Sequence, residues 1–161
     1  MKDILFHTES FVFSYRVAGV IIQNGCLLLQ KPLSDIGYSF IGGHVALGET
    51  SSEALKREFY EETGAKIGVK ELMAIGEVFF PWGKLPCHQI SLYYRIEPDG
   101  CSLPLSGSFK GFCPENNSPE DISFCWVPIE SLPKIVVYPS ELIPHILSGS
   151  RDVRHFISHQ E

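Results

Sequence analysis

One stretch constrains the fold more than any other: residues 42–65, GGHVALGETSSEALKREFYEETGA. Thr50 followed by Glu53 forms a capping box, in which each residue satisfies a backbone N–H of the other at a helix start. The pattern predicts a helix that begins at Ser51. Gly64 ends it, because glycine readily adopts the left-handed conformation that often closes a helix.

Three glutamates share one edge of this predicted helix. At about 100° per residue, Glu62 lies about 40° to one side of Glu58, and Glu61 lies about 60° to the other. Carboxylates at this spacing repel one another, and Arg57, four residues before Glu61, offsets only part of the charge. Clustered carboxylate oxygens suit a hard divalent cation such as Mg²⁺. The alternative is a solvated acidic face without a ligand.

The spacing of the glycines favours the metal site. The stretch resembles the signature of the Nudix hydrolase family, in which glycine, glutamate and Arg-Glu positions recur at fixed intervals before two further glutamates and a glycine. The chain matches the signature at Gly43, Glu49, Arg57, Glu58, Phe59, Glu61, Glu62, Gly64 and Ala65. It departs from the family's usual pattern at Ile41, where proline is common, and at Ala46, where glutamate is common.

The resemblance implies a role for each matched residue. Glu58, Glu61 and Glu62 correspond to the family's metal-binding glutamates, and the carbonyl oxygen of Gly42 corresponds to a further ligand of Mg²⁺ or Mn²⁺. Arg57 and Glu49 correspond to a pair that holds the helix carboxylates in position by charge-assisted bonds. Glu58 is a candidate general base, although other carboxylates serve in some members. A later acid often joins the site, and the candidates here are Glu115, Glu120 and Asp121.

Length and charge narrow the class of protein. A chain of 161 residues is expected to form a single domain, residues 1–161. Its net charge of −6 argues against a nucleic-acid binder, which would need a basic face. Five scattered cysteines indicate reduced thiols, mostly buried, in the cytoplasm. We expect no membrane attachment, because the chain has no run of about 20 apolar residues.

Alternating and β-branched residues predict strands over residues 11–22, 26–30, 38–41, 70–80, 88–96 and 122–127, with a tight turn at Asn24-Gly25. Residues 81–87 are expected to form a rigid loop, residues 99–121 a long loop, and residues 139–147 a short helix. Residues 1–10 and those from 148 onward show no clear pattern. This order predicts an α/β fold, and the resemblance implies a Nudix-type α/β/α sandwich with a mixed β-sheet between helices.

The leading hypothesis is a metal-dependent pyrophosphohydrolase that acts on a small nucleotide. ADP-ribose, a nucleoside triphosphate and a dinucleoside polyphosphate all remain open as substrates, and a homodimer is an open alternative to a monomer. Arg16 is a candidate phosphate contact, and Phe40 and Trp82 are candidates for stacking on a base. The competing hypothesis is a nucleotide-binding regulatory module of the same fold without turnover.

Overall fold

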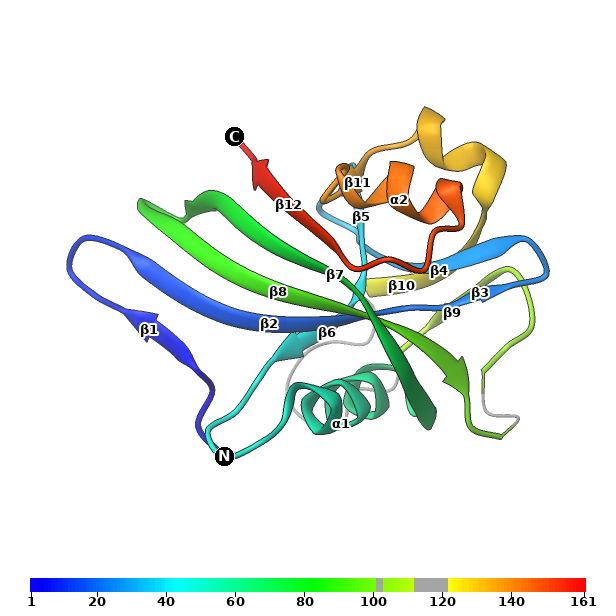
Figure 1. Ribbon diagram of the computed structural model, residues 1–161, viewed down its shortest axis with the longest axis horizontal. Coiled ribbons are helices and arrows are strands. Elements are labelled where there is room, and N and C mark those ends of the chain that lie inside the picture. The colour runs from blue at the N-terminus through cyan, green and yellow to red at the C-terminus, as the bar shows by residue number, and fades with distance from the viewer. Residues whose placement is uncertain (101–102, 112–121) are drawn as a thin grey trace.

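A computed structural model of the chain describes residues 1–100, 103–111 and 122–161 (Figure 1). Two mixed, six-stranded sheets form the centre of the molecule. The first, here called the long sheet, has the strand order β1-β2-β8-β7-β12, with β6 also paired to β2. Its strands are β1 (Leu5–His7), β2 (Val12–Val20), β6 (Ile41–His44), β7 (Ile67–Trp82), β8 (Leu85–Pro98) and β12 (Arg154–His159).

The second sheet, the short sheet, has the order β11-β5-β4-β10-β9, with β3 also paired to β4. Its strands are β3 (Ile22–Gln23), β4 (Cys26–Pro32), β5 (Tyr38–Ser39), β9 (Ser108–Lys110), β10 (Ile122–Pro128) and β11 (Val137–Tyr138). The chain passes from the long sheet to the short one directly after Val20, and the β3–β4 hairpin turns at Asn24 and Gly25, both with positive φ. The predicted tight turn is therefore confirmed.

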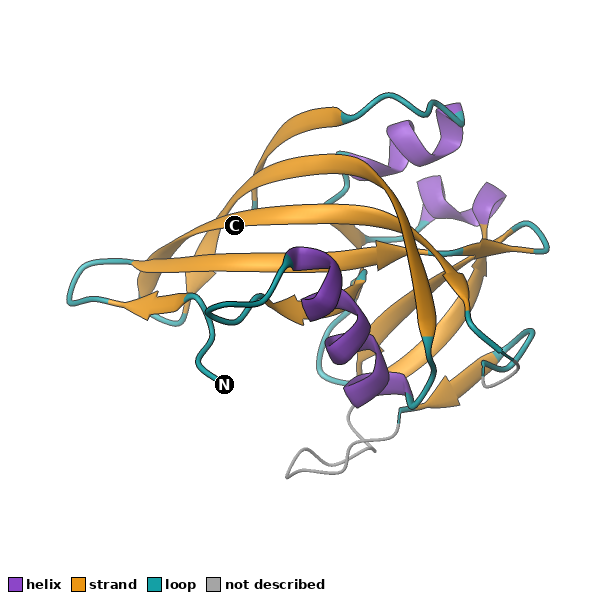
Figure 2. Cartoon of the chain, turned by 60° about the horizontal axis from the view of Figure 1, so that its bottom comes forward, coloured by secondary structure: helices purple, strands orange, loops and turns teal. Residues whose placement is uncertain are grey.

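The helices cover opposite sides of the sheets. In Figures 1 and 2, α1 (Ser51–Thr63) lies on one side, while α2 (Leu142–Ser148) and the 3₁₀ helix η1 (Ile129–Lys134) lie on the other. Each side has its own apolar core, one containing Leu55 and Phe59 of α1 and the other containing Leu142 and Ile146 of α2. The predicted α/β fold with helices on both sides is confirmed, with two mixed sheets between the helices instead of one.

Helix α1 has the predicted boundaries and caps. Thr50 Oγ1 accepts a hydrogen bond from the Glu53 backbone N–H at 3.2 Å, and the Thr50 N–H donates to Glu53 Oε2 at 2.8 Å. Gly64 has a φ of 73° and donates its N–H to the Tyr60 carbonyl at 2.8 Å. Both ends of the helix are therefore fixed by its own sequence.

The rigid loop expected at residues 81–87 is wrong. Strands β7 and β8 continue through this segment and are joined by a two-residue turn, Gly83-Lys84, in which Gly83 has positive φ. Pro81 and Pro86 lie opposite each other one pair beyond the turn. In an antiparallel ladder this pair makes no mutual N–H···O bonds, so neither proline breaks the hairpin.

Four elements lie in segments for which no structure was predicted, among them β11 between η1 and α2. β1 lies within residues 1–10, β12 lies after Ser148, and η1 follows β10. In addition, β9 lies inside the expected 99–121 loop, and α2 begins at Leu142, three residues later than expected. β12 pairs in parallel with β7, and only Phe156 and Ser158 of its side chains are buried. Such a strand carries little apolar signal of its own.

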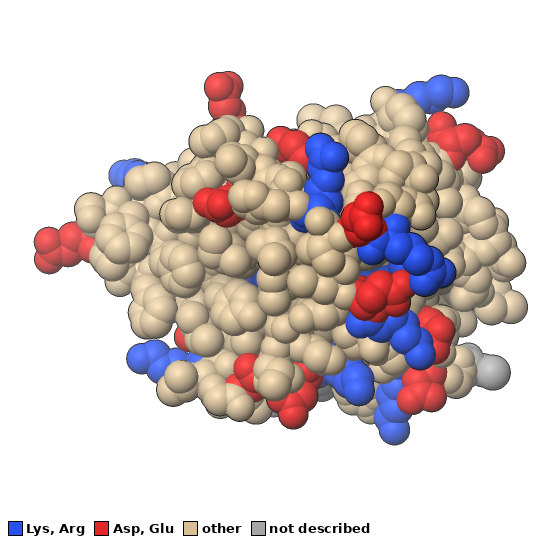
Figure 3. All heavy atoms as spheres, in the orientation of Figure 1, with Lys and Arg blue, Asp and Glu red and all other residues tan. Residues whose placement is uncertain are grey.

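Surface charge is mixed, and the expectation that the cysteines are mostly buried is wrong for those that the structure describes. On the face shown in Figure 3, acidic and basic side chains are interspersed, and the described atoms form no continuous basic surface there. Among the helices in the described parts of the chain, none has the length and hydropathy needed to cross a membrane. The cysteines whose placement is described, Cys26, Cys87 and Cys125, are free thiols, of which only Cys87 is buried.

Candidate active site

Arg57 connects α1 to the loop that precedes it. Its Nε and Nη2 atoms donate to Glu49 Oε1 and Oε2 at 2.8 and 2.9 Å, and Nη2 also donates to the His44 carbonyl at 3.1 Å. The Glu49 carboxylate accepts a further bond from the Ala46 N–H at 3.1 Å. The Arg57 guanidinium lowers the pKa of Glu49, which is therefore an anion that anchors Arg57.

The same arginine orients two of the helix glutamates. Arg57 Nη1 donates to Glu58 Oε1 at 2.8 Å and to Glu61 Oε2 at 3.3 Å. One oxygen of each carboxylate is therefore held by Arg57, and the other has no hydrogen-bond partner within residues 1–100, 103–111 and 122–161. The residues expected to form the positioning pair, Arg57 and Glu49, do lie in contact with each other.

The two glycines of β6 allow β6 to approach its neighbours closely. A Cβ atom at Gly43 would overlap the carboxylate of Glu58, and one at Gly42 would overlap the backbone of β2 at Val17. The Gly42 carbonyl oxygen accepts a long bond of 3.4 Å from Arg16 Nη2. A side chain at 43 would therefore displace the Glu58 carboxylate, and one at 42 would collide with fixed backbone.

Glu62 is the most perturbed acid of the group. Its Oε2 atom is shielded from solvent and has no hydrogen-bond partner among the described residues. Burial, reinforced by the charges of Glu58 and Glu61, raises the pKa of Glu62 to about 8, against the opposing effect of Arg16. Burial also raises the pKa of Glu58, although the bond from Arg57 opposes that shift. Such carboxylates are stabilised as anions only when a further cation is present.

The donor set fits a hard divalent cation. No three acidic, histidine or cysteine side chains converge as a ready metal site within residues 1–100, 103–111 and 122–161, and Arg57 holds part of Glu58 and Glu61. Even so, four hard oxygen ligands are present. They are Oε2 of Glu62, the second carboxylate oxygen of Glu58 and that of Glu61, and the carbonyl oxygen of Gly42. Mg²⁺ and Mn²⁺ prefer ligands of this kind. The metal-binding roles themselves stay predictions.

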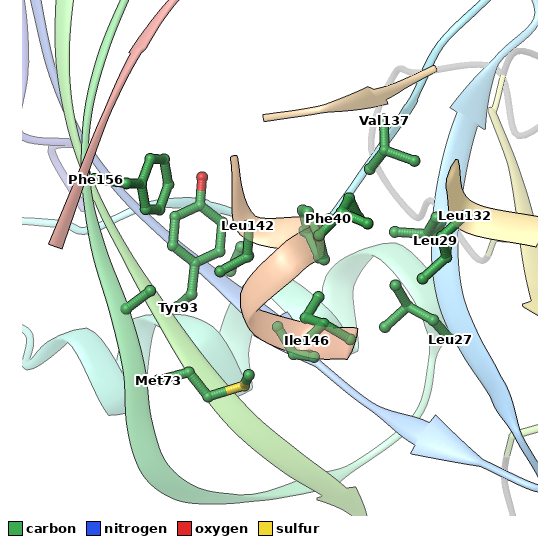
Figure 4. Packing of buried hydrophobic residues seen from close by; sticks show 14 of the residues in the cluster. Leu27, Leu29, Phe40, Met73, Tyr93, Leu132, Val137, Leu142, Ile146 and Phe156 are labelled. Carbon is green, nitrogen blue, oxygen red and sulfur yellow. The ribbon is translucent and has the colours of Figure 1, made fainter. Parts of the chain in front are cut away.

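A cleft of about 260 Å³ adjoins these residues. Arg16 and Trp82, two of the predicted substrate contacts, line it, and Arg16 also donates to the Phe40 carbonyl at 3.2 Å. The side chain of Phe40 does not reach the cleft. It is fully buried and packs against Tyr93 with ring centroids 5.6 Å apart (Figure 4). The expectation that Phe40 stacks on a base is therefore wrong, because its ring belongs to the α2-side core.

Other cleft residues were not anticipated from the sequence. Tyr138 and Pro139 border the cleft from the segment before α2, Gln89 comes from β8, and Gln160 follows β12. Gln89 stands between His88 and Ile90, with Ser91 two residues on, so the local sequence does not mark it as a cleft residue. The later acids Glu115, Glu120 and Asp121 lie outside the described residues.

Several solved structures share the fold of this chain. The MutT protein from Bacillus halodurans aligns with a TM-score of 0.60 and 22% identity over 87% of this chain and 85% of that one. The ORF135 protein of E. coli aligns with a TM-score of 0.57 and 21% identity, over 84% and 89% of the two chains. An ADP-ribose pyrophosphatase from Streptococcus suis aligns with a TM-score of 0.56 and 15% identity, over 88% and 98%.

At these identities the alignments establish the fold, and the sequence itself establishes the family. The model of the NUDIX domain matches residues 13–146, which include the whole short sheet, α1, β6, β7, β8 and nearly all of β2, but not β1 or β12 of the long sheet. The chain therefore belongs to the Nudix family.

Proposed function

We propose that this protein hydrolyses the pyrophosphate bond of a nucleoside diphosphate linked to another moiety, with Mg²⁺ or Mn²⁺ as cofactor. The observation that carries the proposal is the arrangement on α1, where Arg57 holds Glu58 and Glu61 beside the unpaired, buried oxygen of Glu62. The proposal also agrees with the family, whose members are generally hydrolases of pyrophosphate bonds.

The residues divide into three roles. The carboxylates of Glu58, Glu61 and Glu62 and the carbonyl oxygen of Gly42 would hold the cation. A bound divalent cation polarises phosphoryl oxygens and lowers the pKa of a coordinated water. Arg57 and Glu49 are positioning residues, because Arg57 bonds to Glu58 and Glu61, and Glu49 acts by anchoring Arg57.

Three side chains would act on the attacking water and on the substrate. Arg57 occupies Oε1 of Glu58, so Oε2 is the atom that would either join the ligands of the cation or take the proton of the attacking water. Arg16 joins the cleft to Gly42, and its guanidinium would meet the phosphate oxygens of a substrate whose other end lies in the cleft. Trp82 would offer an aromatic face to that end.

The wider proposal concerns the whole chain. We infer that residues 1–161 form one catalytic domain that acts on small nucleotides in the cytoplasm, where free thiols such as Cys26, Cys87 and Cys125 persist. ADP-ribose, nucleoside triphosphates and dinucleoside polyphosphates are the substrate classes to be compared. Sedimentation velocity at micromolar concentration distinguishes the monomer from a homodimer.

The test is a nucleotide panel assayed with Mg²⁺ or Mn²⁺, with and without a chelator, by release of phosphate or AMP. We expect turnover that stops with the chelator and that falls at least about 100-fold in Glu61→Gln or Glu62→Gln, as when catalytic charge stabilisation is lost. Glu130→Gln is the matched control, because Glu130 is exposed on η1, away from the described site residues.

Two results would contradict the proposal. Rates unchanged in both site variants would show that these glutamates are not the catalytic group. Nucleotide binding without turnover under any metal condition would favour the regulatory module instead.

A further inference from the structure

A row of polar side chains lies buried on the inner face of the long sheet. Ser14 of β2 and Ser91 of β8 are 0% exposed, and Gln89 of β8 is 8% exposed. Ser14 and Gln89 are partners in the parallel β2–β8 register, and Ser91 follows two residues later on the same face. Buried polar groups are costly compared with apolar ones unless they are hydrogen-bonded. The presence of three buried polar side chains in adjacent positions therefore needs a physical explanation.

The three side chains bond to one another. The Ser14 hydroxyl donates to Gln89 Oε1 at 3.1 Å, and Gln89 Nε2 donates to the Ser91 hydroxyl at 2.9 Å. One serine therefore bonds to the oxygen of the Gln89 carboxamide, and the other bonds to its nitrogen. A carboxamide can make four hydrogen bonds, two through its oxygen and two through its nitrogen. Ser14 and Ser91 use one of each, so one donor and one acceptor of the carboxamide are not used by these two serines.

The remaining donor and acceptor belong to a residue of the cleft wall. Gln89 lines the cleft together with Arg16, Trp82 and Tyr138. Arg16 marks the end of the cleft next to the helix glutamates, since it also bonds to the Gly42 carbonyl. At about 260 Å³ the cleft is smaller than the pockets of about 300–1,000 Å³ that enclose whole drug-sized ligands. It is therefore suited to one part of a substrate.

We propose that Gln89, held by Ser14 and Ser91, reads the nucleobase of the substrate through a paired hydrogen-bond donor and acceptor. The partner is the edge of a base on which an N–H or amino group stands beside an unprotonated nitrogen or a carbonyl oxygen, as a glutamine carboxamide pairs with adenine. A sugar or inorganic phosphate offers no such planar edge. Ser14 and Ser91 are positioning residues, because they act through Gln89.

This inference rests on the proposed function only for the diphosphate part of the substrate, so base binding can be measured separately from turnover. The probes are AMP, GMP, CMP and UMP, with ribose 5-phosphate as the base-free control, titrated by calorimetry into the whole protein. The variants are Gln89→Met, which keeps the size of the side chain and removes the carboxamide, and the matched control Gln23→Met on β3 of the short sheet.

In the unsubstituted protein we expect the best nucleotide to bind about 5- to 150-fold more tightly than the worst, the range given by one bidentate base contact. In Gln89→Met this spread should shrink to about twofold while the affinity for ribose 5-phosphate is unchanged. Gln23→Met should keep the full spread. Thermal unfolding of each variant confirms that the fold is intact before titration.

Ser14→Ala provides a second test if Gln89→Met does not fold. We expect it to reduce the spread between bases and to raise KM for the best substrate with little change in kcat, because the carboxamide is misoriented while the helix glutamates are untouched. Ser14→Thr, which keeps the hydroxyl, should restore the spread. A serine with only a structural role would change stability in Ser14→Ala without changing the ratio between bases.

The inference is overturned if the unsubstituted protein binds every nucleotide as weakly as ribose 5-phosphate, or if Gln89→Met retains the spread. Turnover accompanied by a retained spread would leave the proposed hydrolysis in place and remove the role of Gln89. A Gln89-dependent spread without any metal-dependent turnover would support base reading and refute the hydrolysis.

Discussion

Replacing Glu62 with glutamine tests the electrostatics of α1 without relying on catalysis. Burial raises the pKa of Glu62 to about 8 in the folded protein, whereas glutamate in an unfolded chain titrates near its ordinary value of about 4.3. The folded state therefore binds this proton more tightly than the unfolded state. As the pH rises from 4.3 towards 8, the free energy of unfolding must fall, because folding then requires a buried anion or the uptake of a proton.

The size of the effect follows from the two pKa values. Between pH 6 and pH 8 this one carboxyl removes about 2 kcal/mol from the free energy of unfolding. For a chain of this length that change corresponds to a fall of about 4 to 8 °C in Tm. Glutamine is neutral at every pH, so the Tm of Glu62→Gln should depend less on pH by about that amount. Differential scanning calorimetry of both proteins in chelator, at half-unit pH steps, measures the difference.

Adding Mg²⁺ should have the opposite effect and raise the free energy of unfolding. At pH 8 a cation at 100 times its dissociation constant should raise the free energy of unfolding by about 2.7 kcal/mol, and Glu62→Gln should gain less because one charged ligand is gone. Glu130→Gln should behave as the unsubstituted protein does. Parallel Tm curves for the unsubstituted protein and Glu62→Gln would refute the reasoning, because they would mean that Glu62 is not held as a buried, unpaired acid.

Three further substitutions test other parts of the site. Arg57→Lys should lower activity about 10- to 100-fold, because lysine cannot make both bonds to Glu49 while orienting Glu58; steady-state kinetics at saturating Mg²⁺ checks this. Gly43→Ala should lower the free energy of unfolding by about 1–3 kcal/mol in urea titrations, because the added Cβ overlaps Glu58, whereas Gly68→Ala, where a Cβ meets only ordinary contacts, should not. Thr50→Ala should cost about 1 kcal/mol in the same titrations, because it removes the cap of α1; an unchanged midpoint would show that the capping box adds nothing.

The parts of the fold that were predicted correctly depend on neighbouring residues. Thr50 and Glu53 are three residues apart, and Asn24 and Gly25 are adjacent, so the helix start and the hairpin turn could be derived locally. β12 could not, because its six residues become a strand only by pairing with β7, far away in the sequence. Prolines suggested a loop where the register of the β7–β8 hairpin makes Pro81 and Pro86 harmless.

The same distinction holds for the site. The spacing of Arg57, Glu58, Glu61 and Glu62 on one helix indicated that these residues would meet, and the structure brings three of them into contact. Phe40 was misassigned because an aromatic residue beside a glycine turn has no local feature that separates a core ring from an exposed one. The bonds of Gln89 with Ser14 depend on the pairing of β2 with β8, which the sequence does not reveal.

The pairing of β12 with β7 also affects how the chain is made. A ribosome releases β7 well before β12, and during that interval the outer edge of β7 has free N–H and C=O groups. Exposed strand edges of this kind promote association between chains. Until β12 has paired with β7, the sheet ends at this exposed edge and the cleft lacks the wall provided by Gln160.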